Sequence, residues 1–581
     1  MQPNRTRWRL LAAWLAVFCG FAAVAHGDFE TTDAAFTMQA ARALVMRGDS
    51  GLRLPEQGAT SPAEIAAAAW IHAHEAEGAR KDGKIGSNGL AYVWYPVGHL
   101  WLLVPFVALG EGLGAVAPWL EAAFRDRIAP GSDDRDLVQR LDFVTATPVV
   151  MQSVIAVLLP PACLATTTLL LLLLAQRLGA GRADAARTAL AIVLATQCFA
   201  LGREQLSDGP GLTLLVALLL LVVPKPDGAT SPGRAFAAGA VAGAAVLLRY
   251  QTAFVVLAAL LALVLACRRR RDWRGLAAFA AGGLPFAALL LLVNWQRFGD
   301  PLVTGYPKAD DWFDQPIWSG LPKILLGAGR GILWCSPLLW LALPLAFRRR
   351  DVPQQRWLAW TLFLTPVLMF AAARGWQGGQ CWSVRYVTPG VVALLALVLP
   401  QALPWRRWPR TWLCLCGLGL FANASSVVAP VRGVLQLAAQ AVQAQLDHDV
   451  AAGRLDAAAA ARVDAADVTG WAPRYSPFVV NWRYALQSHV GGFELATGQP
   501  NDGSTTTIEA LFGIAAATPA QGLAPQRFED RCARHLWWRF WGDLLGVSGL
   551  WLVLPVAAFT ILFAWFGWRP LLRPSGSSTV G

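Results

Sequence analysis

The sequence contains few charged residues for its length. Aspartate, glutamate, lysine and arginine together make up 15% of the 581 residues, whereas they make up about one-quarter of a soluble domain. Hydrophobic residues make up 55% of the chain, and the mean hydropathy is +0.44. The apolar residues form blocks close to the length that crosses a bilayer. This composition excludes an ordinary soluble domain and predicts an integral membrane protein.

Sequence motifs of several enzyme classes are also absent. The chain contains no Walker A loop, no dinucleotide-binding fingerprint, no zinc-ligand motif and no nucleophile elbow. None of its nine cysteines forms a Cys-x-x-Cys pair, and most lie within apolar blocks, where small core residues are expected. The chemistry is therefore expected from carboxylates and arginines at the outer ends of the apolar blocks.

Positive charge gathers at the ends of the apolar blocks. The formal net charge is +12, and arginine runs such as 268–271 and 348–350 are typical of cytoplasmic loops rather than of a nucleic-acid-binding surface. From residue 175 onward this rule gives a consistent alternation of inside and outside loops. Before residue 175 it fails, because single crossings at 97–119 and 147–175 would place Arg177 outside. Either one of these blocks does not cross fully, or the loop assignment is wrong there.

The apolar blocks predict an all-α polytopic membrane protein, a bundle of about 11–13 transmembrane helices. The predicted parts are a transmembrane module at 1–430, a first extracytoplasmic loop with amphipathic helices within it at 27–96, a late extracytoplasmic loop region at 431–543, a final transmembrane helix at 544–566 and a disordered tail at 567–581. Gly239 and Gly243 are spaced so that one helix can pack closely against a neighbour.

Carboxylates are concentrated directly after the first apolar block. Asp28, Glu30 and Asp33 lie within six residues. A helix is predicted to begin near Asp33 and to end at Gly48, which places Asp33 in the first turn, where the helix dipole favours a carboxylate. The simpler interpretation is an acidic cap on a helix that lies along the membrane surface.

Further polar residues stand at other outer ends, where a charge costs free energy unless it is paired or faces water. These are Glu204 with Asp208, Tyr95 with His99, Arg249, the segment from Asn294 to Tyr306, and the segment from Gly375 to Tyr386. Structural interpretations remain open for each of them: a hydrophilic turn broken by glycine and proline, a buried histidine, an arginine that extends to the interface, or a belt of interfacial tryptophans.

In their order along the chain, these features resemble the GT-C class of polytopic glycosyltransferases, in the branch of protein O-mannosyltransferases and lipid A aminoarabinose transferases. Asp33 with Phe36, Ala41 and Arg42 is similar to the acidic pattern after the first span of that family, although Ala34 stands where the family usually has glutamate. The resemblance covers roughly residues 1–430.

Later motifs strengthen this resemblance. Asp208, preceded by Arg203, is similar to a second acidic position of the family, and Glu204 is an alternative for it. The stretch Asn-x-x-Arg-Phe-Gly-Asp-Pro from Asn294 and the stretch Trp-x-Gly-Gly-x-x-Trp-x-x-Arg-Tyr from Trp376 resemble motifs of bacterial members.

The resemblance implies an inverting transfer of a sugar, hexose or pentose, from a polyprenyl-phosphate-linked donor to a lipid, protein or glycan acceptor on the extracytoplasmic face of a bacterial inner membrane. Asp33 is the expected general base, and Asp208 or Glu204 would orient the acceptor or a metal. The expected substrate-binding residues are Asp28, Lys84, Tyr95, His99, Arg249, Tyr306, Lys308, Trp376 and Arg385. A divalent cation, Mg or Mn, would find oxygen ligands in Asp28, Asp33 and Asp208.

Two other classes of function remain open. A transporter or flippase for lipid-linked sugars would show internal repeats and charges deep within the spans, and neither pattern is found in the sequence. A sugar-polymer ligase or polymerase would keep a large outer loop and use arginines without the element around Asp33.

Overall fold

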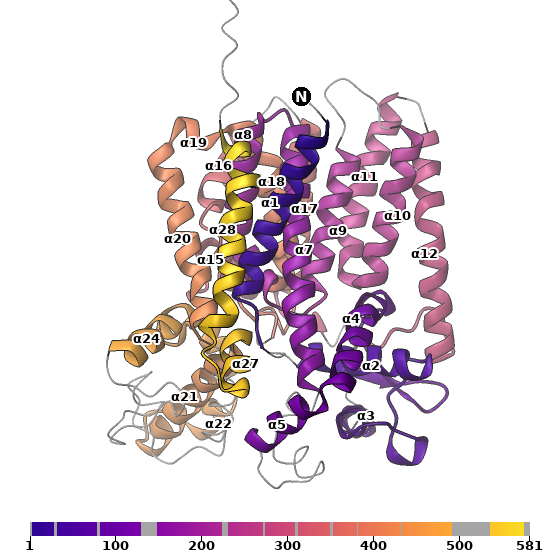
Figure 1. Ribbon diagram of the computed structural model, residues 1–581, viewed down its shortest axis with the longest axis vertical. Coiled ribbons are helices and arrows are strands. Elements are labelled where there is room, and N and C mark those ends of the chain that lie inside the picture. The colour runs from indigo at the N-terminus through magenta and orange to yellow at the C-terminus, as the bar shows by residue number, and fades with distance from the viewer. Residues whose placement is uncertain are drawn as a thin grey trace, which may run out of the picture.

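The computed structural model describes residues 3–27, 32–77, 82–128, 148–223, 231–270, 273–307, 312–348, 353–379, 381–429, 431–490 and 535–573 (Figure 1). These residues form a bundle of long helices that run roughly parallel to one another. Within the described ranges, the β structure consists of one sheet of two short strands and an isolated bridge between Leu52 and Ala91. The predicted all-α fold is confirmed.

The helices that run along the bundle alternate in direction. They are α1 (Pro3–Ala23), α7 (Val149–Arg177), α8 (Arg182–Leu194), α9 (Asp208–Val222), α10 (Pro232–Leu248), α11 (Ala253–Arg270), α12 (Arg274–Phe298), α16 (Leu339–Arg348), α17 (Pro353–Ala371), α18 (Thr388–Ala402), α20 (Pro409–Val428) and α28 (Leu550–Leu572). We call the end at which α7 and α16 finish with Arg177 and Arg348 the arginine-rich end, and the opposite end the site end.

The number of helices that are long and apolar enough to cross a membrane is smaller than predicted. Six described helices meet both criteria, whereas the sequence predicted about 11–13 spans. Several predicted spans are instead apolar helices of 10 to 17 residues, such as α9 and α10. Another is broken into α15 (Ile332–Cys335) and α16. These lengths and compositions confirm an integral membrane protein.

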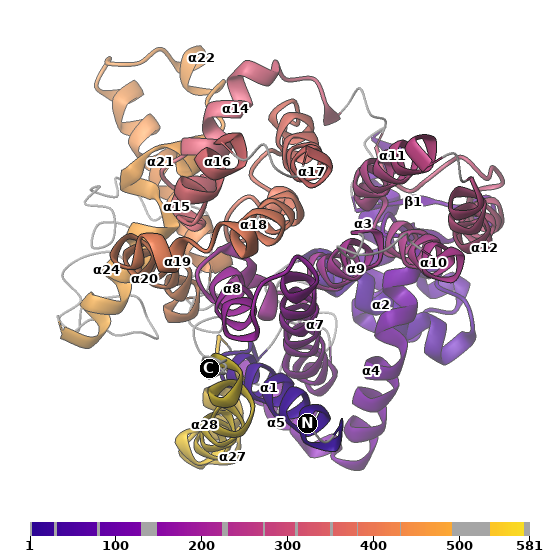
Figure 2. The ribbon, with the colours of Figure 1, turned by 90° about the horizontal axis from the view of Figure 1, so that it is seen from above.

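Helix α4 (Val97–Val116) resolves the conflict in the predicted topology. It is long and apolar enough to span a membrane, but Figure 2 shows it lengthwise while α7, α9 and α10 are seen end-on. A Cβ on Gly98 would lie 2.6 Å from the carbonyl oxygen of Leu247, in the last turn of α10. A Cβ on Gly110 would lie 2.7 Å from the Cα of Met151, in the first turn of α7. Both contacts are at the site end, so α4 crosses beneath the bundle and α7 alone carries the chain to Arg177.

The remaining elements gather mainly at the site end (Figure 1). They are α2 (Thr32–Arg47), α3 (Pro62–Ala76), β1 (Gly83–Ile85), β2 (Ala91–Val93), α5 (Pro118–Ile128), α14 (Ile317–Leu326), α21 (Val431–Ala451), α22 (Ala457–Ala460), α23 (Ala465–Trp471), α24 (Pro477–Val490) and α27 (Trp537–Leu545), with α19 (Pro404–Arg407) at the arginine-rich end. Strands β1 and β2 pair antiparallel, with Lys84 opposite Tyr92. Single 3₁₀ turns include η3 (Tyr250–Thr252) and η4 (Arg385–Val387).

Glycines allow the backbones of α10 and α12 to pack closely against each other. A Cβ on Gly239 would lie 1.9 Å from the carbonyl oxygen of Phe279, and one on Gly282 would lie 2.1 Å from that of Phe236. No side chain fits at such distances, so only glycine allows the two backbones to approach this closely. The close packing predicted for Gly239 is confirmed.

The predicted helix after the first span is α2, which ends before Gly48 with that glycine at a φ of 78°. The expected membrane-facing orientation is wrong. Phe36 and Ala40 are buried, at 2% and 0% exposure, in a cluster that includes Leu100 of α4. Because α3 and α4 cover it, this apolar face packs against protein rather than lipid.

The C-terminal boundaries also differ from the prediction. The final helix α28 covers 550–572 instead of 544–566, so residues 567–572 of the predicted disordered tail are helical. Residues 574–581 lie outside the described part of the chain. The alanine-rich start of the late region, predicted as part of an extracytoplasmic loop region, forms α21 and α22.

Candidate active site

Four charged side chains from distant segments meet at the site end of the bundle. Asp33 lies in the first turn of α2, and Asp208 begins α9. Arg249 directly follows α10, and Arg385 begins the 3₁₀ turn that leads into α18. Because α9 and α18 start at this end and α10 finishes there, their termini lie close together although residues 33 and 385 are 352 positions apart.

The four side chains form a continuous chain of opposite charges. The Nη2 of Arg385 lies 3.0 Å from Oδ2 of Asp33, and its Nη1 lies 3.8 Å from Oδ2 of Asp208. The Nη1 of Arg249 lies 2.5 Å from the same oxygen of Asp208. Two carboxylates and two guanidinium groups therefore balance one another in a largely buried site, as a buried charge requires.

Exposure distinguishes the two carboxylates. The side chain of Asp208 is 3% exposed, whereas that of Asp33 is 20% exposed. Neither oxygen of Asp208 accepts an aligned hydrogen bond from the described residues, so its charge is held mainly by the two guanidinium groups. Asp33 is therefore the carboxylate that an incoming substrate can reach.

Tyr386 supports both arginines. The guanidinium carbons of Arg385 and Arg249 lie 5.0 and 5.6 Å from the centroid of its ring, within cation–π range. Arg385 also donates a hydrogen bond of 3.2 Å to the Tyr386 hydroxyl, and Phe370 stacks on the ring at 4.4 Å. Tyr386 belongs to the Trp-x-Gly-Gly-x-x-Trp-x-x-Arg-Tyr stretch but was not among the predicted substrate-binding residues. Its position next to an arginine at the end of an apolar block could have identified it as a site residue.

The loop that carries Arg385 is held from beneath by Arg330. This arginine is 3% exposed, and its Nη1 donates hydrogen bonds to the carbonyl oxygens of Gln377 and Gly379, at 3.0 and 2.5 Å. Burial lowers the pKa of Arg330 to about 10, so the group stays charged at neutral pH. Gly378 and Gly379 have φ angles of 78° and 75°, a conformation that glycine adopts without strain.

Glu204 and Asn423 hold the same loop through Trp382. The Oε1 of Glu204 accepts a hydrogen bond of 3.1 Å from the backbone N–H of Trp382, and the Oδ1 of Asn423 accepts one of 3.0 Å from its indole. Glu204 therefore positions the loop that presents Arg385. Its predicted role as an alternative to Asp208, orienting the acceptor or a metal, stays a prediction.

Aromatic residues lie beside the charged cluster. Tyr306 stacks on Trp94 with ring centroids 5.3 Å apart, and Tyr250 meets Tyr306 edge-on at 5.7 Å. Burial raises the pKa of the Tyr95 phenol well above its ordinary value, and the negative charge of Asp33 raises it further. Burial likewise raises the pKa of Tyr306. Both phenols therefore remain neutral hydrogen-bond donors near Asp33.

Of the other predicted binding residues, His99 lies near Arg249 and Asp208 of the cluster, whereas Lys84 and Trp376 contact other parts of the structure. His99 is buried in α4, 2% exposed, and its Nδ1 has no hydrogen-bond partner among the described residues. Lys84 lies on β1 of the two-stranded hairpin, and its Nζ lies 5.5 Å from the ring centroid of Phe298, at the end of α12. Trp376 donates its indole N–H to Oδ1 of Asp467 at 2.9 Å, which joins it to α23 of the late region. Asp28 and Lys308 lie outside the described residues.

The charged cluster fits an anion better than a metal ion. The described residues contain no group of three or more His, Cys, Asp or Glu side chains that could hold a metal. Of the three predicted ligands, Asp28 is not described, while Asp33 and Asp208 both contact Arg385. A cation at these oxygens would lie beside a guanidinium group, and like charges repel. The divalent cation stays a prediction.

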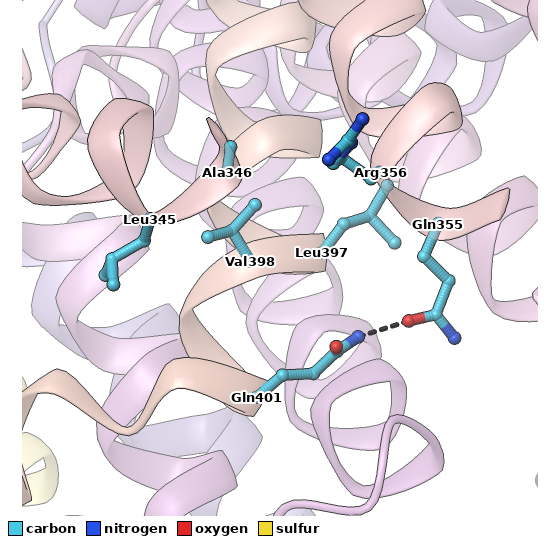
Figure 3. Close-up of a pocket in the computed structure, with 7 residues that line it drawn as sticks. All are labelled: Leu345, Ala346, Gln355, Arg356, Leu397, Val398 and Gln401. Carbon is cyan, nitrogen blue, oxygen red and sulfur yellow. Dashed lines mark hydrogen bonds between the residues drawn. The ribbon is translucent and has the colours of Figure 1, made fainter. Parts of the chain in front are cut away.

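A small cavity lies near the end of α18 that is remote from Arg385. Figure 3 shows a cavity of about 20 Å³ between α16, α17 and α18, where the side-chain amides of Gln401 and Gln355 are hydrogen-bonded. This volume has room for about one water molecule. Arg385 precedes the opposite end of α18, so the cavity is separate from the charged cluster.

The family model described as dolichyl-phosphate-mannose-protein mannosyltransferase matches residues 144–295 of this chain. The resemblance is confirmed over this segment. The matched segment contains α7 to α11 and most of α12, and with them Asp208 and Arg249. It leaves Asp33 and Arg385 outside, so the resemblance of these two residues to the family rests on their motifs.

Solved structures of ArnT from Cupriavidus metallidurans are also similar to this chain. The structure bound to undecaprenyl phosphate has a TM-score of 0.41 and 16% identity, covering 93% of this chain and 77% of that chain. The apo structure has a TM-score of 0.40 and 17% identity, covering 97% of this chain and 77% of that chain. No curated protein sequence matches the chain.

Proposed function

We propose that this protein is a membrane glycosyltransferase that transfers a sugar from a polyprenyl-phosphate-linked donor to an acceptor on the extracytoplasmic face of a bacterial inner membrane. The observation that carries the proposal is the charged cluster, in which a partly exposed carboxylate adjoins two buried arginines. The match of residues 144–295 to the mannosyltransferase family supports it.

Asp33 serves as the general base. The acceptor hydroxyl attacks the anomeric carbon of the donor, and its proton moves to the carboxylate of Asp33 as the new C–O bond forms. The bond between the anomeric carbon and the phosphate oxygen breaks, and its electron pair leaves with the polyprenyl phosphate. A single displacement of this kind inverts the anomeric centre. Asp33 suits this role because it is the more exposed of the two carboxylates.

Arg249 and Arg385 bind the leaving phosphate. The departing polyprenyl phosphate becomes a monoester and gains negative charge as its bond to the sugar breaks, and it forms charge-assisted hydrogen bonds with guanidinium groups. When the donor phosphate binds Arg385, it competes with Asp33 for that guanidinium. Loss of the ion pair frees the carboxylate of Asp33, so donor binding makes this carboxylate available to the acceptor hydroxyl.

The position of the cluster suits a lipid-linked donor. Arg385 precedes an apolar helix that runs through the bundle, so a phosphate bound there lies at the membrane interface while its prenyl chain stays in lipid. The same position argues against a transporter or flippase, because buried charges of a transport path are expected near mid-span. A sugar-polymer ligase is the weaker alternative, because it would not need Asp33 beside the arginines.

Replacement of Asp33 tests the proposal. Asp33→Asn should reduce transfer by about 10²–10⁴-fold, the usual contribution of a general base, with membrane insertion and protein level unchanged. The measurement compares glycolipids and glycoproteins from cells that carry the wild-type chain, the variant or no copy. Asp49→Asn is the matched control, because Asp49 lies in the same outer segment and its partners among the described residues are its neighbours Gly51 and Arg53. Normal glycans in the Asp33→Asn cells would refute the assignment.

A further inference from the structure

A groove at the arginine-rich end lies between the first and the last described helices. Both Figure 1 and Figure 2 place α1 beside α28, with the start of α1 and the finish of α28 at this end. The groove has a volume of about 540 Å³, and its lining includes Trp8, Arg9, Trp565, Phe566, Arg569 and Arg573. Three arginines from two helices thus converge on one concave surface.

Close packing fixes the walls of the groove. A Cβ on Gly567 would lie 2.2 Å from the backbone N of Ala13, so α28 touches the backbone of α1 there. The indole of Trp568 is buried and donates a hydrogen bond of 2.9 Å to the carbonyl oxygen of Ala13. Because the two helices are held together at this level, the backbone positions that carry the arginines are fixed relative to one another.

The charge of the groove is not balanced by its own helices. Neither the α1 sequence nor the α28 sequence contains an aspartate or a glutamate. Helix α8 packs against α28, but the carboxylate of its Asp184 accepts hydrogen bonds from Trp405 and Arg406. The guanidinium carbon of Arg569 lies 3.5 Å from the centroid of the Trp565 ring, within cation–π range.

The exposed aromatic residues indicate the level of the lipid headgroups. Trp8, Trp565 and Phe566 are 69%, 57% and 58% exposed, and tryptophan is enriched where headgroups meet the hydrocarbon. Below them, the most apolar stretch of α28 is 6% buried inside the protein, so it offers an apolar surface to lipid. A ligand of this groove would therefore meet cationic groups at one end and apolar side chains at the other.

We propose that this groove binds an anionic phospholipid of the cytoplasmic leaflet, with its headgroup phosphate between Arg9, Arg569 and Arg573 and an acyl chain along Phe566. Basic pockets between helices on the cytoplasmic side suit such headgroups. A free phosphate ion would gain nothing from the apolar part of the groove. The site is distinct from the proposed donor site, which lies at the opposite end of the bundle.

Lipid retention by the purified full-length chain tests the proposal. The protein is placed in detergent micelles that contain dioleoyl phosphatidylglycerol, tetraoleoyl cardiolipin or dioleoyl phosphatidylcholine, and bound lipid is counted by native mass spectrometry. We expect retention of the two anionic lipids over phosphatidylcholine. The triple variant Arg9→Gln/Arg569→Gln/Arg573→Gln should lower their affinity by about a hundredfold, because each basic residue near the surface contributes roughly fivefold.

The matched control removes the same charge at the same end of the bundle. The triple variant Arg348→Gln/Arg407→Gln/Arg410→Gln replaces exposed arginines of other helices and should keep the wild-type lipid retention. Equal loss in both variants would show a general surface charge instead of a site, and so would overturn the proposal. Unchanged retention in the groove variant, or displacement of the lipid by inorganic phosphate alone, would also overturn it. The single variant Arg573→Gln, at an exposed position after α28, gives a smaller loss without risk to folding.

Discussion

The two ends of the bundle use arginine in opposite ways. At the arginine-rich end, Arg348 and Arg410 are exposed. By the positive-inside rule, the number of arginines at such an end determines the orientation of the chain in the membrane. At the site end, Arg249 and Arg385 are 9% and 7% exposed, and each contacts a carboxylate from another segment. The comparison teaches that the position of an arginine at the end of an apolar block does not reveal its role. Burial and partners decide it.

Burial explains why the site end needs a fixed arrangement. An uncompensated buried charge costs several kcal/mol even after the protein relaxes, and this cost falls only when an opposite charge lies close by. Asp208 accepts no aligned hydrogen bond from the described residues, so the free energy of its burial depends on Arg249 and Arg385. An exposed arginine is solvated by water and needs no such partner.

The largest expected effect follows from removal of Asp208. Asp208→Ala leaves two buried guanidinium groups against one carboxylate and should lower the free energy of unfolding by about 3–5 kcal/mol. Thermal unfolding of the purified protein in detergent measures the change. Transfer activity should also be lost, because the arginines then repel each other and leave their positions.

A double variant separates charge imbalance from lost packing. Asp208→Ala/Arg249→Met restores one carboxylate to one guanidinium and should recover most of the stability, since a buried ion pair can be replaced by apolar groups at little cost. Activity should stay absent, because a phosphate-binding arginine is missing. A double variant no more stable than Asp208→Ala alone would contradict the proposed charge balance.

The sequence predicted the members of the charged cluster but not their contacts. Asp33, Asp208, Arg249 and Arg385 are candidates from the sequence because a charge at a span end costs free energy unless it is paired or faces water. Their pairing depends on which helix ends meet, and no local pattern records a contact across 352 residues. The same rule makes Glu204 a candidate, but its carboxylate accepts a hydrogen bond from the loop at Trp382. The sequence cannot separate the two roles, because a carboxylate can anchor a loop as well as bind a substrate.

The orientation of α4 shows the corresponding limit for the fold. High hydropathy indicates that a helix has apolar surroundings. A helix that crosses beneath a bundle has such surroundings, and so does a helix that spans a membrane, so hydropathy cannot distinguish the two. The charge alternation exposed the inconsistency at 97–119, and the glycines of α4 explain it, since Gly98 and Gly110 lie against two helix termini at one end.

The next effect in size concerns this packing of α4. Gly98→Ala would place a Cβ 2.6 Å from the carbonyl oxygen of Leu247 and so push α4 away from α10, at a cost of about 1–3 kcal/mol. The neighbouring His99 would move with it, so activity should fall together with thermal stability. Both are measured on the same purified variant.

Gly112→Ala is the control within the same helix. A Cβ at Gly112 would meet nothing within 4 Å, so alanine should be neutral or stabilise α4 by about 0.5–1 kcal/mol through its better helix propensity. If α4 spanned the membrane away from α10, the two variants would behave alike. A stable, active Gly98→Ala protein would therefore refute the crossing arrangement.

The smallest effect is expected at the arginine-rich end and completes the comparison. Arg410→Gln changes an exposed residue in the first turn of α20, where an arginine faces the positive end of the helix dipole. Its replacement should change the free energy of unfolding by less than about 0.5 kcal/mol and leave membrane orientation unchanged, because many other arginines at this end maintain the charge bias. Arg385→Gln makes the same chemical change at the site end and should abolish transfer, since Asp33 and Asp208 lose their shared partner. Comparable losses in the two variants, measured by thermal unfolding and transfer activity, would mean that the ends of the bundle do not differ in the way their burial indicates.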